Sequence, residues 1–236
     1  MKYQMQGRVR FSEVDSGKYI TLPAIINYFQ DCSTFQSEEL GVGFKHLESH
    51  HKAWILSSWQ IVLRRRPKIG EAITVETWAT GFQGIYGVRN FEMKDEQGQT
   101  AACANSIWVY MDMQAGRPAK PSEEQIRLYN VEPALEMEYA PRKINLPDKC
   151  QDGPVFPVRK YHIDTNGHVN NCQYVQMALE ALPAEAKVRQ VRVEYKKAAV
   201  FGDEILPKLA VEEDRTVVEL CETGGKPFAV VEFVME

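Results

Sequence analysis

The stretch from Tyr161 to Tyr174 gathers an acid, an imidazole and several carboxamides within a few residues. The acid is Asp164 and the imidazole is His168, with Asn166 between them. A neutral imidazole beside a carboxylate can act as a general base near neutral pH. A carboxamide can hold a water molecule or donate a hydrogen bond to an oxyanion. This density of groups predicts an acid–base site.

The same stretch runs directly into a predicted helix, whose first N–H groups and positive dipole end suit a developing oxyanion. Its residues also have plain structural roles. Asp164 and Asn166 could close a turn, and Asn170 or Asn171 could cap the helix. Each residue taken alone fits the structural role better, and only their density favours a site.

Hydrophobic alternation with a period of two residues predicts a chain built mostly of β-strands. The predicted strands are Trp54–Val62, Ala72–Trp78, Val88–Met93, Ala104–Tyr110, Val188–Tyr195, Ile205–Val211, Val217–Leu220 and Phe228–Val234. Asp95–Gly98 and Thr223–Lys226 are typical of hairpin turns.

Two longer helices are expected. Thr21 can cap the first, with Pro23 in its first turn and Gly41 at its end. The second is expected from Asn170 to Leu182, where Pro183 stops it. Each of these helices follows a short polar loop.

The two helices belong to two similar halves of the chain. Val14–Gly17 resembles Ile163–Asn166, and Ile69–Ile73 resembles Phe201–Ile205. Upstream of the second pair, Arg65-Arg66 and Lys197-Ala198 lie at equal offsets. The consistent order indicates a duplication. Each half is therefore expected to be a curved antiparallel sheet wrapped around one helix, an α+β arrangement.

The predicted boundaries place an N-terminal half at residues 1–130 and a C-terminal half at residues 154–236. The segment 131–153, rich in Pro, Glu and Lys, reads as a linker between them. Ser122 and Gln125 fit a capping box for a short third helix near the end of the first half.

Composition narrows the class of protein. The chain has 44% hydrophobic residues, 25% charged residues and a net charge of −4, which is typical of a globular protein without a general nucleic-acid-binding surface. No apolar run is long enough for a membrane span, and no signal peptide is recognisable, so a cytoplasmic protein without membrane insertion is expected. The five cysteines are not spaced as metal ligands, so neither a metal site nor a cofactor is expected.

The catalytic stretch also resembles a known family. The pattern D-x-N-G-H-V-N-N-x-x-Y, from Asp164 to Tyr174, resembles the signature of hotdog thioesterases, and its Asp-x-Asn-x-His part is similar to the catalytic loop of plant and bacterial fatty acyl-ACP thioesterases. The resemblance extends to Trp59–Ile61, Arg66–Gly70, Val75–Trp78 and Glu194–Lys197.

This resemblance implies a tandem (double) hotdog fold, each half an antiparallel sheet wrapped around a long α-helix. It implies a thiolester hydrolase of fatty acid biosynthesis that releases a free fatty acid from acyl carrier protein. Asp164, Asn166 and His168 would be catalytic, with either water or the Asp164 carboxylate as the nucleophile. The first half would bind the acyl chain, and the chain would be a monomer or a homodimer.

Five further residues are candidates for substrate binding. Backbone N–H groups near Val169 would serve the oxyanion, Asn171 belongs to the signature, and Trp59 could line the acyl tunnel. Arg64 and Arg66 belong to the basic run that ends at Lys68, which is either a solvated strand end or a docking patch for the acidic carrier. Alternation along a strand would place Arg64 and Arg66 on one face.

One departure from the family concerns its fourth catalytic group. The family often has Glu or Cys on the strand after the catalytic helix, where this chain has Ala198 and Ala199. Alanine can do no acid–base work, so the group is missing or comes from elsewhere, with Glu194 as a possible substitute. His46, His50 and His51 lie in a polar segment that is expected to be an exposed loop.

Three alternatives fit parts of the pattern. An acyl-CoA thioesterase of the same fold would usually be an assembly of single hotdogs. A hydroxyacyl dehydratase would need a Pro-Gly pair, which this chain lacks. A catalytically silent acyl-binding module would explain the missing fourth group, but not the intact Asp164, Asn166 and His168.

Overall fold

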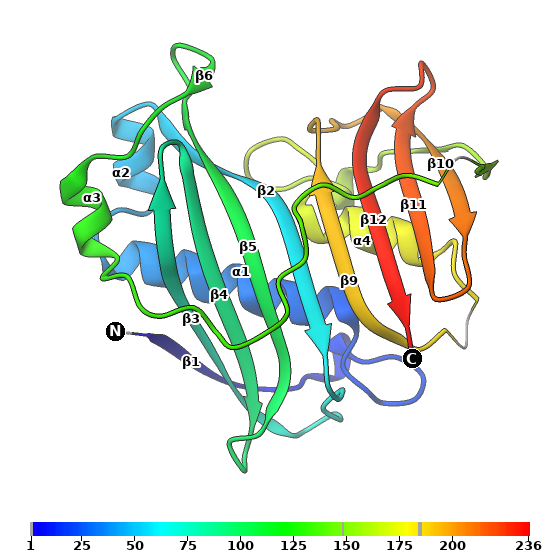
Figure 1. Cartoon of the computed structure of the whole chain (residues 1–236), viewed down its shortest axis with the longest axis horizontal. Helices are drawn as coiled ribbons and strands as arrows, with labels where there is room; N and C mark the ends of the chain where they lie inside the picture. Colours follow the sequence, from blue (N-terminus) through cyan, green and yellow to red (C-terminus); the bar gives the residue numbers. More distant parts are fainter. Residues whose placement is uncertain (1, 148, 184–185) are drawn as a thin grey trace. The chain divides into compact units, whose positions relative to one another are not determined.

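The computed structural model describes residues 2–147, 149–183 and 186–236. Contacts divide the chain into two compact units: residues up to Ser57 with Ile61–Tyr139, and Ser58–Gln60 with Ala140–Glu236. Each unit consists of antiparallel strands and one main helix (Figure 1), which confirms the predicted α+β class. The exact boundaries of the two halves and the division of labour between them stay predictions.

The first unit is a five-stranded sheet in the order β1-β3-β4-β5-β2, with a short β6 paired to β5. Its strands are β1 (Tyr3–Arg8), β2 (Lys52–Leu63), β3 (Ala72–Gln83), β4 (Tyr86–Asp95), β5 (Thr100–Asp112) and β6 (Arg117–Pro118). Its helical elements are η1 (Phe11–Glu13), α1 (Leu22–Glu39), α2 (Phe44–Ser49) and α3 (Glu123–Leu128).

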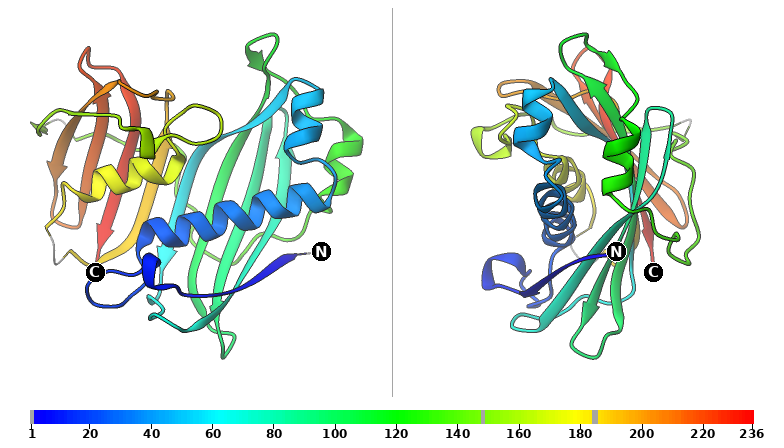
Figure 2. Two further views of the ribbon diagram at one scale, coloured as in Figure 1. Left: turned by 180° about the vertical axis from the view of Figure 1, so that it is seen from behind. Right: turned by 90° about the vertical axis from the view of Figure 1, so that its left-hand side faces the viewer.

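Helix α1 lies across one face of this sheet, as the left view of Figure 2 shows. Thr21 is its N-cap, with its side chain accepting a hydrogen bond from the N–H of Ala24 at 3.3 Å. The face of α1 toward the sheet buries Ile25 and Phe29, and Phe29 packs against Phe91 with ring centroids 5.3 Å apart. The predicted first helix is therefore confirmed.

The second unit repeats this plan with the sheet order β9-β12-β11-β10-β7, while β8 also pairs with β10. Its strands are β7 (Gln151–Asp152), β8 (Phe156–Pro157), β9 (Val188–Tyr195), β10 (Glu204–Val211), β11 (Arg215–Glu222) and β12 (Pro227–Met235). Its helical elements are η2 (Lys160–His162) and α4 (Asn171–Leu179), and α4 contacts β11 and β12.

The duplication inferred from sequence recurs in the backbone hydrogen bonds of the loop before each main helix. The first-half bonds are Glu13 N to Arg10 O, Asp15 N to Tyr19 O, Lys18 N to Asp15 O and Thr21 N to Glu13 O. The second-half bonds are His162 N to Arg159 O, Asp164 N to His168 O, Gly167 N to Asp164 O and Asn170 N to His162 O. Position for position, Asp15 therefore matches Asp164 and Tyr19 matches His168.

The strand ends that face these loops match in the same way. Arg64 and Arg65 both donate their backbone N–H to the carbonyl of Ala101, and Lys196 and Lys197 both donate to the carbonyl of Phe228. Ile20 donates to the carbonyl of Pro67 over 2.8 Å, and Val169 donates to that of Ala199 over 2.9 Å. Pro67 therefore matches Ala199, and Arg66 matches Ala198.

Helix α4 is shorter than predicted, because it ends at Leu179 rather than Leu182. The ring of Pro183 disfavours the helical conformation at Leu182, the residue before it. The chain instead closes with tighter bonds, from Ala181 N to Ala178 O and from Leu182 N to Leu179 O. Asn170 is the N-cap and accepts from the N–H of Cys172 at 2.9 Å, as the structural alternative predicted.

Two local expectations in the first half were wrong. The segment expected to be a loop around His46 contains helix α2, whose first N–H, on Phe44, donates to the carboxylate of Glu38 at 2.7 Å. Strand β2 ends at Leu63, so the alternation assumed for the arginines after it does not apply. There the chain leaves the ladder, because Arg64 and Arg65 share one carbonyl acceptor.

Within the described ranges, no helix is both long enough and apolar enough to cross a lipid bilayer. Over the same residues, no group of His, Cys, Asp and Glu is arranged to hold a metal ion.

Candidate active site

The predicted catalytic residues lie on one tight loop between η2 and α4. An isolated antiparallel bridge joins Ile163 to Val169, and the Asp164 N–H donates to the His168 carbonyl over 2.8 Å. Gly167 turns the chain with a φ of 76°, a conformation that suits glycine. The loop therefore brings Asp164, Asn166 and His168 together within one turn.

The Asp164 carboxylate organises this loop. Its Oδ1 atom accepts from the backbone N–H groups of Asn166 at 2.8 Å and His168 at 3.3 Å. Its Oδ2 atom meets only the side-chain amide of Asn166, at 3.5 Å, among the contacts described for it. Oδ1 is thus committed to the turn, while Oδ2 keeps lone pairs for a water molecule or an electrophile.

Asn166 and His168 are exposed, whereas Asp164 is half-buried. The backbone of His168 is fixed by Asp164, and its imidazole lies at the surface, where a substrate from solution can reach it. A carboxylate, a carboxamide and an imidazole in this arrangement can position water and transfer a proton.

The two signature residues expected to bind substrate, Val169 and Asn171, have structural partners. The N–H of Val169 is bonded to the carbonyl of Ala199, so this N–H is not free to stabilise an oxyanion. The carbonyl of Asn171 accepts from the hydroxyl of Tyr195 at 2.9 Å. Donation to an oxyanion is left to groups such as the Asn166 amide.

Two tyrosines brace the loop against the end of β9. The hydroxyl of Tyr174, on α4, accepts from the N–H of Ala199 at 2.8 Å, and burial raises the pKa of Tyr174 to about 12. Its ring meets that of Tyr195 at 5.8 Å, close to edge-on. Tyr174 was visible in the signature, whereas nothing in the sequence marked the role of Tyr195.

Glu194, the possible substitute for the fourth catalytic group, is buried on β9 and already bonded. Its carboxylate accepts from the ammonium of Lys196 at 2.5 Å and from the N–H of Ile144 at 3.1 Å. These bonds give Glu194 a structural task.

The matching loop of the first half carries a different set of side chains. Tyr19 stands where the second half has His168, and Gly17 where it has Asn166. The Asp15 carboxylate accepts from the N–H of Tyr19 at 3.1 Å and from the guanidinium of Arg66 at 2.5 Å. Burial alone would raise the pKa of Asp15, but the bonds from Arg66 and the backbone hold it below its ordinary value.

The other predicted binding residues are dispersed. Trp59, on β2, is almost fully buried, and Arg64 is exposed just past the end of that strand. Arg65 is ion-paired with Asp95 and Glu71, each at 2.8 Å. Arg66 is paired with Asp15, so two of the four cations of the predicted basic run are engaged in ion pairs, and the other two, Arg64 and Lys68, are exposed.

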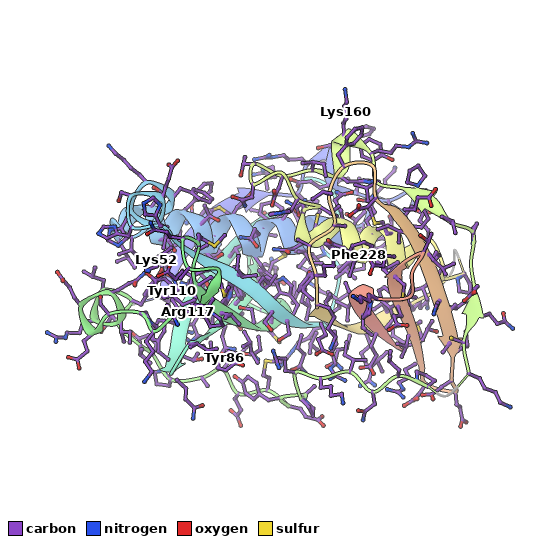
Figure 3. The ribbon with its side chains drawn as sticks, turned by 90° about the horizontal axis from the view of Figure 1, so that it is seen from above. Lys52, Tyr86, Tyr110, Arg117, Lys160 and Phe228 are labelled. Carbon is purple, nitrogen blue, oxygen red and sulfur yellow. The ribbon has the colours of Figure 1, made fainter. Side chains whose placement is uncertain are left out.

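Exposed basic and aromatic residues flank the second-half loop instead. Arg159 and Lys160 are exposed, and Figure 3 shows Lys160 projecting outward. Tyr161 is 77% exposed and Phe201 57%, and the Lys160 ammonium lies 6.0 Å from the Phe201 ring. The sequence gives little sign of this patch, because Arg159 and Lys160 lie just before the signature and Phe201 lies far from them in the chain.

Two units of antiparallel strands, each with one main helix, and one Asp-Asn-His loop define a double hotdog protein. The Acyl-ACP thioesterase N-terminal domain matches residues 1–129, and the Acyl-ACP thioesterase C-terminal domain matches residues 148–223. The chain therefore belongs to the acyl-ACP thioesterase family.

Curated relatives and solved structures agree with this family. The chain is 26% identical over 246 residues to oleoyl-acyl carrier protein thioesterase 1, chloroplastic, of Arabidopsis thaliana, covering 95% of this chain and 66% of that protein. It is 27% identical over 237 residues to the palmitoyl-acyl carrier protein thioesterase, chloroplastic, of the same plant, covering 92% and 55%. The chain thus spans between about half and two thirds of the length of these relatives.

Among solved structures, an acyl-ACP thioesterase from Bacteroides thetaiotaomicron superposes with a TM-score of 0.92 at 23% identity, covering 100% of this chain and 98% of that one. The 12:0-ACP thioesterase from Umbellularia californica superposes with a TM-score of 0.85 at 20% identity, covering 100% and 97%. At these identities the likeness establishes the shared fold.

Proposed function

We propose that this protein hydrolyses fatty acyl thioesters of acyl carrier protein to a free fatty acid and the carrier thiol. The observation that carries the proposal is the loop of Asp164, Asn166 and His168, in which a half-buried carboxylate is bonded to the backbone of both other residues and their side chains are exposed. Membership of the acyl-ACP thioesterase family supports the carrier protein as the substrate's carrier.

The chemistry follows from the atoms that the loop leaves available. Water, or Oδ2 of Asp164 itself, attacks the thioester carbonyl, and the C–S bond breaks when the tetrahedral intermediate collapses. His168 accepts the proton of the attacking water and returns it to the departing thiolate, while the Asn166 amide donates to the oxyanion. If Asp164 attacks first, water then hydrolyses the resulting anhydride to give the same products.

The roles of the first half belong to the same proposal. Its main helix and sheet would bind the acyl chain, and Trp59 would help to line the acyl tunnel. Arg64 would contribute to docking, and Arg159 and Lys160 would add positive charge beside the loop. The cytoplasmic location and the monomeric or homodimeric state stay predictions.

The test compares the two matching loops. Asp164→Asn and His168→Ala should each lower kcat with acyl carrier protein thioesters by at least about a hundredfold, the usual scale for an acid–base group. The matched first-half substitutions, Asp15→Asn and Tyr19→Ala, should leave kcat close to that of the wild type. Circular dichroism and thermal unfolding would show that each variant is folded.

Wild-type rates in both second-half variants would refute the assignment of the site. Running the same assay with acyl-CoA across chain lengths tests the carrier. A higher kcat/KM for acyl-CoA than for acyl carrier protein would favour the acyl-CoA thioesterase alternative. No turnover of either substrate by the folded wild type would favour a silent acyl-binding module.

A further inference from the structure

The two matching loops differ in one residue of the neighbouring strand end, which in the first half pairs with the aspartate. In the first half this residue is Arg66, and in the second half it is Ala198. The backbone on either side is bonded alike in the two halves, through the shared carbonyl acceptors and through Pro67 and Ala199. The difference therefore lies in the side chain and not in the path of the chain.

Arg66 holds the first-half loop through three hydrogen bonds, an arrangement called here the arginine lock. Its Nη2 atom donates to Oδ2 of Asp15 at 2.5 Å and to the carbonyl of Tyr19 at 3.2 Å, and its Nε atom donates to the carbonyl of Ile20 at 2.7 Å. Its guanidinium also lies 5.9 Å from the centroid of the Tyr19 ring. One arginine thus binds the carboxylate and two carbonyls of the loop at once.

The second half offers the same acceptors without the arginine. The positions of Asp15, Tyr19 and Ile20 are taken by Asp164, His168 and Val169, but the methyl group of Ala198 stands in place of the arginine side chain. Within the part of the chain that the structure describes, no cation forms an ion pair with Asp164. Oδ2 is therefore left to the long contact with the Asn166 amide.

We propose that Ala198 is the residue that keeps the second-half loop active, because its uncharged side chain leaves Oδ2 of Asp164 without an ion-pair partner. The first half is a locked copy of the same loop, in which Arg66 occupies the corresponding oxygen. This inference rests on the proposed function, since it takes Asp164 as the catalytic carboxylate.

The physical reason is the strength of a charge-assisted pair between guanidinium and carboxylate. Such a pair occupies the carboxylate lone pairs that would otherwise accept a hydrogen bond from the nucleophilic water or attack the acyl carbon. A fixed positive charge beside His168 would also disfavour the protonated imidazole formed when water is deprotonated. Position 198 acts in this way through Asp164 and His168, so it is a positioning residue and not a catalytic one.

The decisive experiment introduces the arginine with Ala198→Arg and uses Ala198→Met, an unbranched and shorter side chain without charge, as its control. We expect Ala198→Arg to lower kcat by at least about a hundredfold, the loss expected when the acid–base group is disabled. Ala198→Met should retain activity within about tenfold of the wild type, because it cannot pair with the carboxylate. Ala198→Lys should act in the same sense as the arginine and replaces it if the arginine variant does not fold.

A readout independent of activity comes from thermal unfolding. A surface ion pair should raise the unfolding midpoint of Ala198→Arg above that of Ala198→Met by about 1–4 °C. This difference should vanish when Asp164→Asn is added to both variants, because the pair has lost its charge. Equal loss of activity in the arginine and methionine variants, or a difference in midpoint that persists with Asp164→Asn, would overturn the proposal.

Failure of this inference is distinguishable from failure of the proposed function. If Asp164→Asn alone keeps wild-type turnover, the site assignment fails. If Asp164→Asn is inactive while Ala198→Arg remains active, the site stands and the lock is refuted.

Discussion

Removing the hydroxyl of Tyr174 is expected to destabilise the protein through a single unsatisfied N–H group. The Tyr174 side chain is 2% exposed, and its hydroxyl accepts from the N–H of Ala199, a residue with no exposed surface. Tyr174→Phe keeps the ring and its packing but leaves this donor without its partner. An unsatisfied buried donor costs about 1–3 kcal/mol, so the free energy of unfolding should fall by that amount.

The first half supplies the compensating change. At the matching positions it has Ile25 and Pro67, so it has neither the hydroxyl nor the N–H. Adding Ala199→Pro to Tyr174→Phe removes the orphaned donor and should recover most of the lost stability. Ala199 should accept proline, because its carbonyl accepts from Val169 as the carbonyl of Pro67 accepts from Ile20.

Urea unfolding followed by circular dichroism would measure both variants, with kcat as a second readout. Tyr174→Phe should also lower kcat if the proposed site is correct, since the carbonyl of Ala199 holds the loop of Asp164 and His168 through the N–H of Val169. A loss smaller than about 0.5 kcal/mol would show that water satisfies the donor. A double variant less stable than Tyr174→Phe would refute the matching of Ala199 with Pro67.

Three further outcomes are expected. Burial, and to a lesser degree the charge of Arg159, lowers the pKa of His162, whose Nδ1 accepts from the backbone N–H of Arg159. The contribution of His162 to the free energy of unfolding should therefore be fully present above the pKa of histidine in the unfolded chain, about 6.5, and be lost as the pH falls through its lowered pKa in the folded protein. Unfolding of His162→Gln should not show this decline. Replacing Arg159 and Lys160 with Glu should raise KM for acyl carrier protein thioesters several-fold, and the increase should be smaller at high salt. KM for pantetheine thioesters should not change. As a control, Arg10→Glu at the matching first-half position should have little effect on KM. Glu194→Gln should reduce stability with kcat unchanged, and a large fall in kcat in a stable variant would make Glu194 the fourth catalytic group.

Strand positions were readable from the sequence because the alternation that produces them is local. The stretches expected around Val188–Tyr195 and Ile205–Val211 are β9 and β10 with almost the same limits. The hairpin turn at Asp95–Gly98 formed as expected, with Gly98 at a φ of 76°. Helix α2 was missed because it is too short to show a period, and a carboxylate from the end of α1 caps it.

The sequence by itself determined the fold class, the duplication and the loop that carries the candidate site. Thr21 and Asn170 cap the main helices through bonds to residues two or three positions away, and the Asp164 turn closes within five residues. Interactions of such short range depend on neighbouring residue types, which are visible in the chain. The α+β arrangement follows from them together with hydrophobic alternation.

Only the tertiary structure decided which charged and polar groups are free. Arg66 pairs with Asp15, which lies 51 positions earlier in the chain. The carbonyl of Ala199 accepts from the N–H of Val169, and the N–H of Ala199 donates to the hydroxyl of Tyr174. These partners are distant in sequence and are set by how each strand end folds back over its loop. The availability of a carboxylate or an N–H group depends on all of its neighbours in space, and the residue pattern of the loop alone contains only those nearest in the chain.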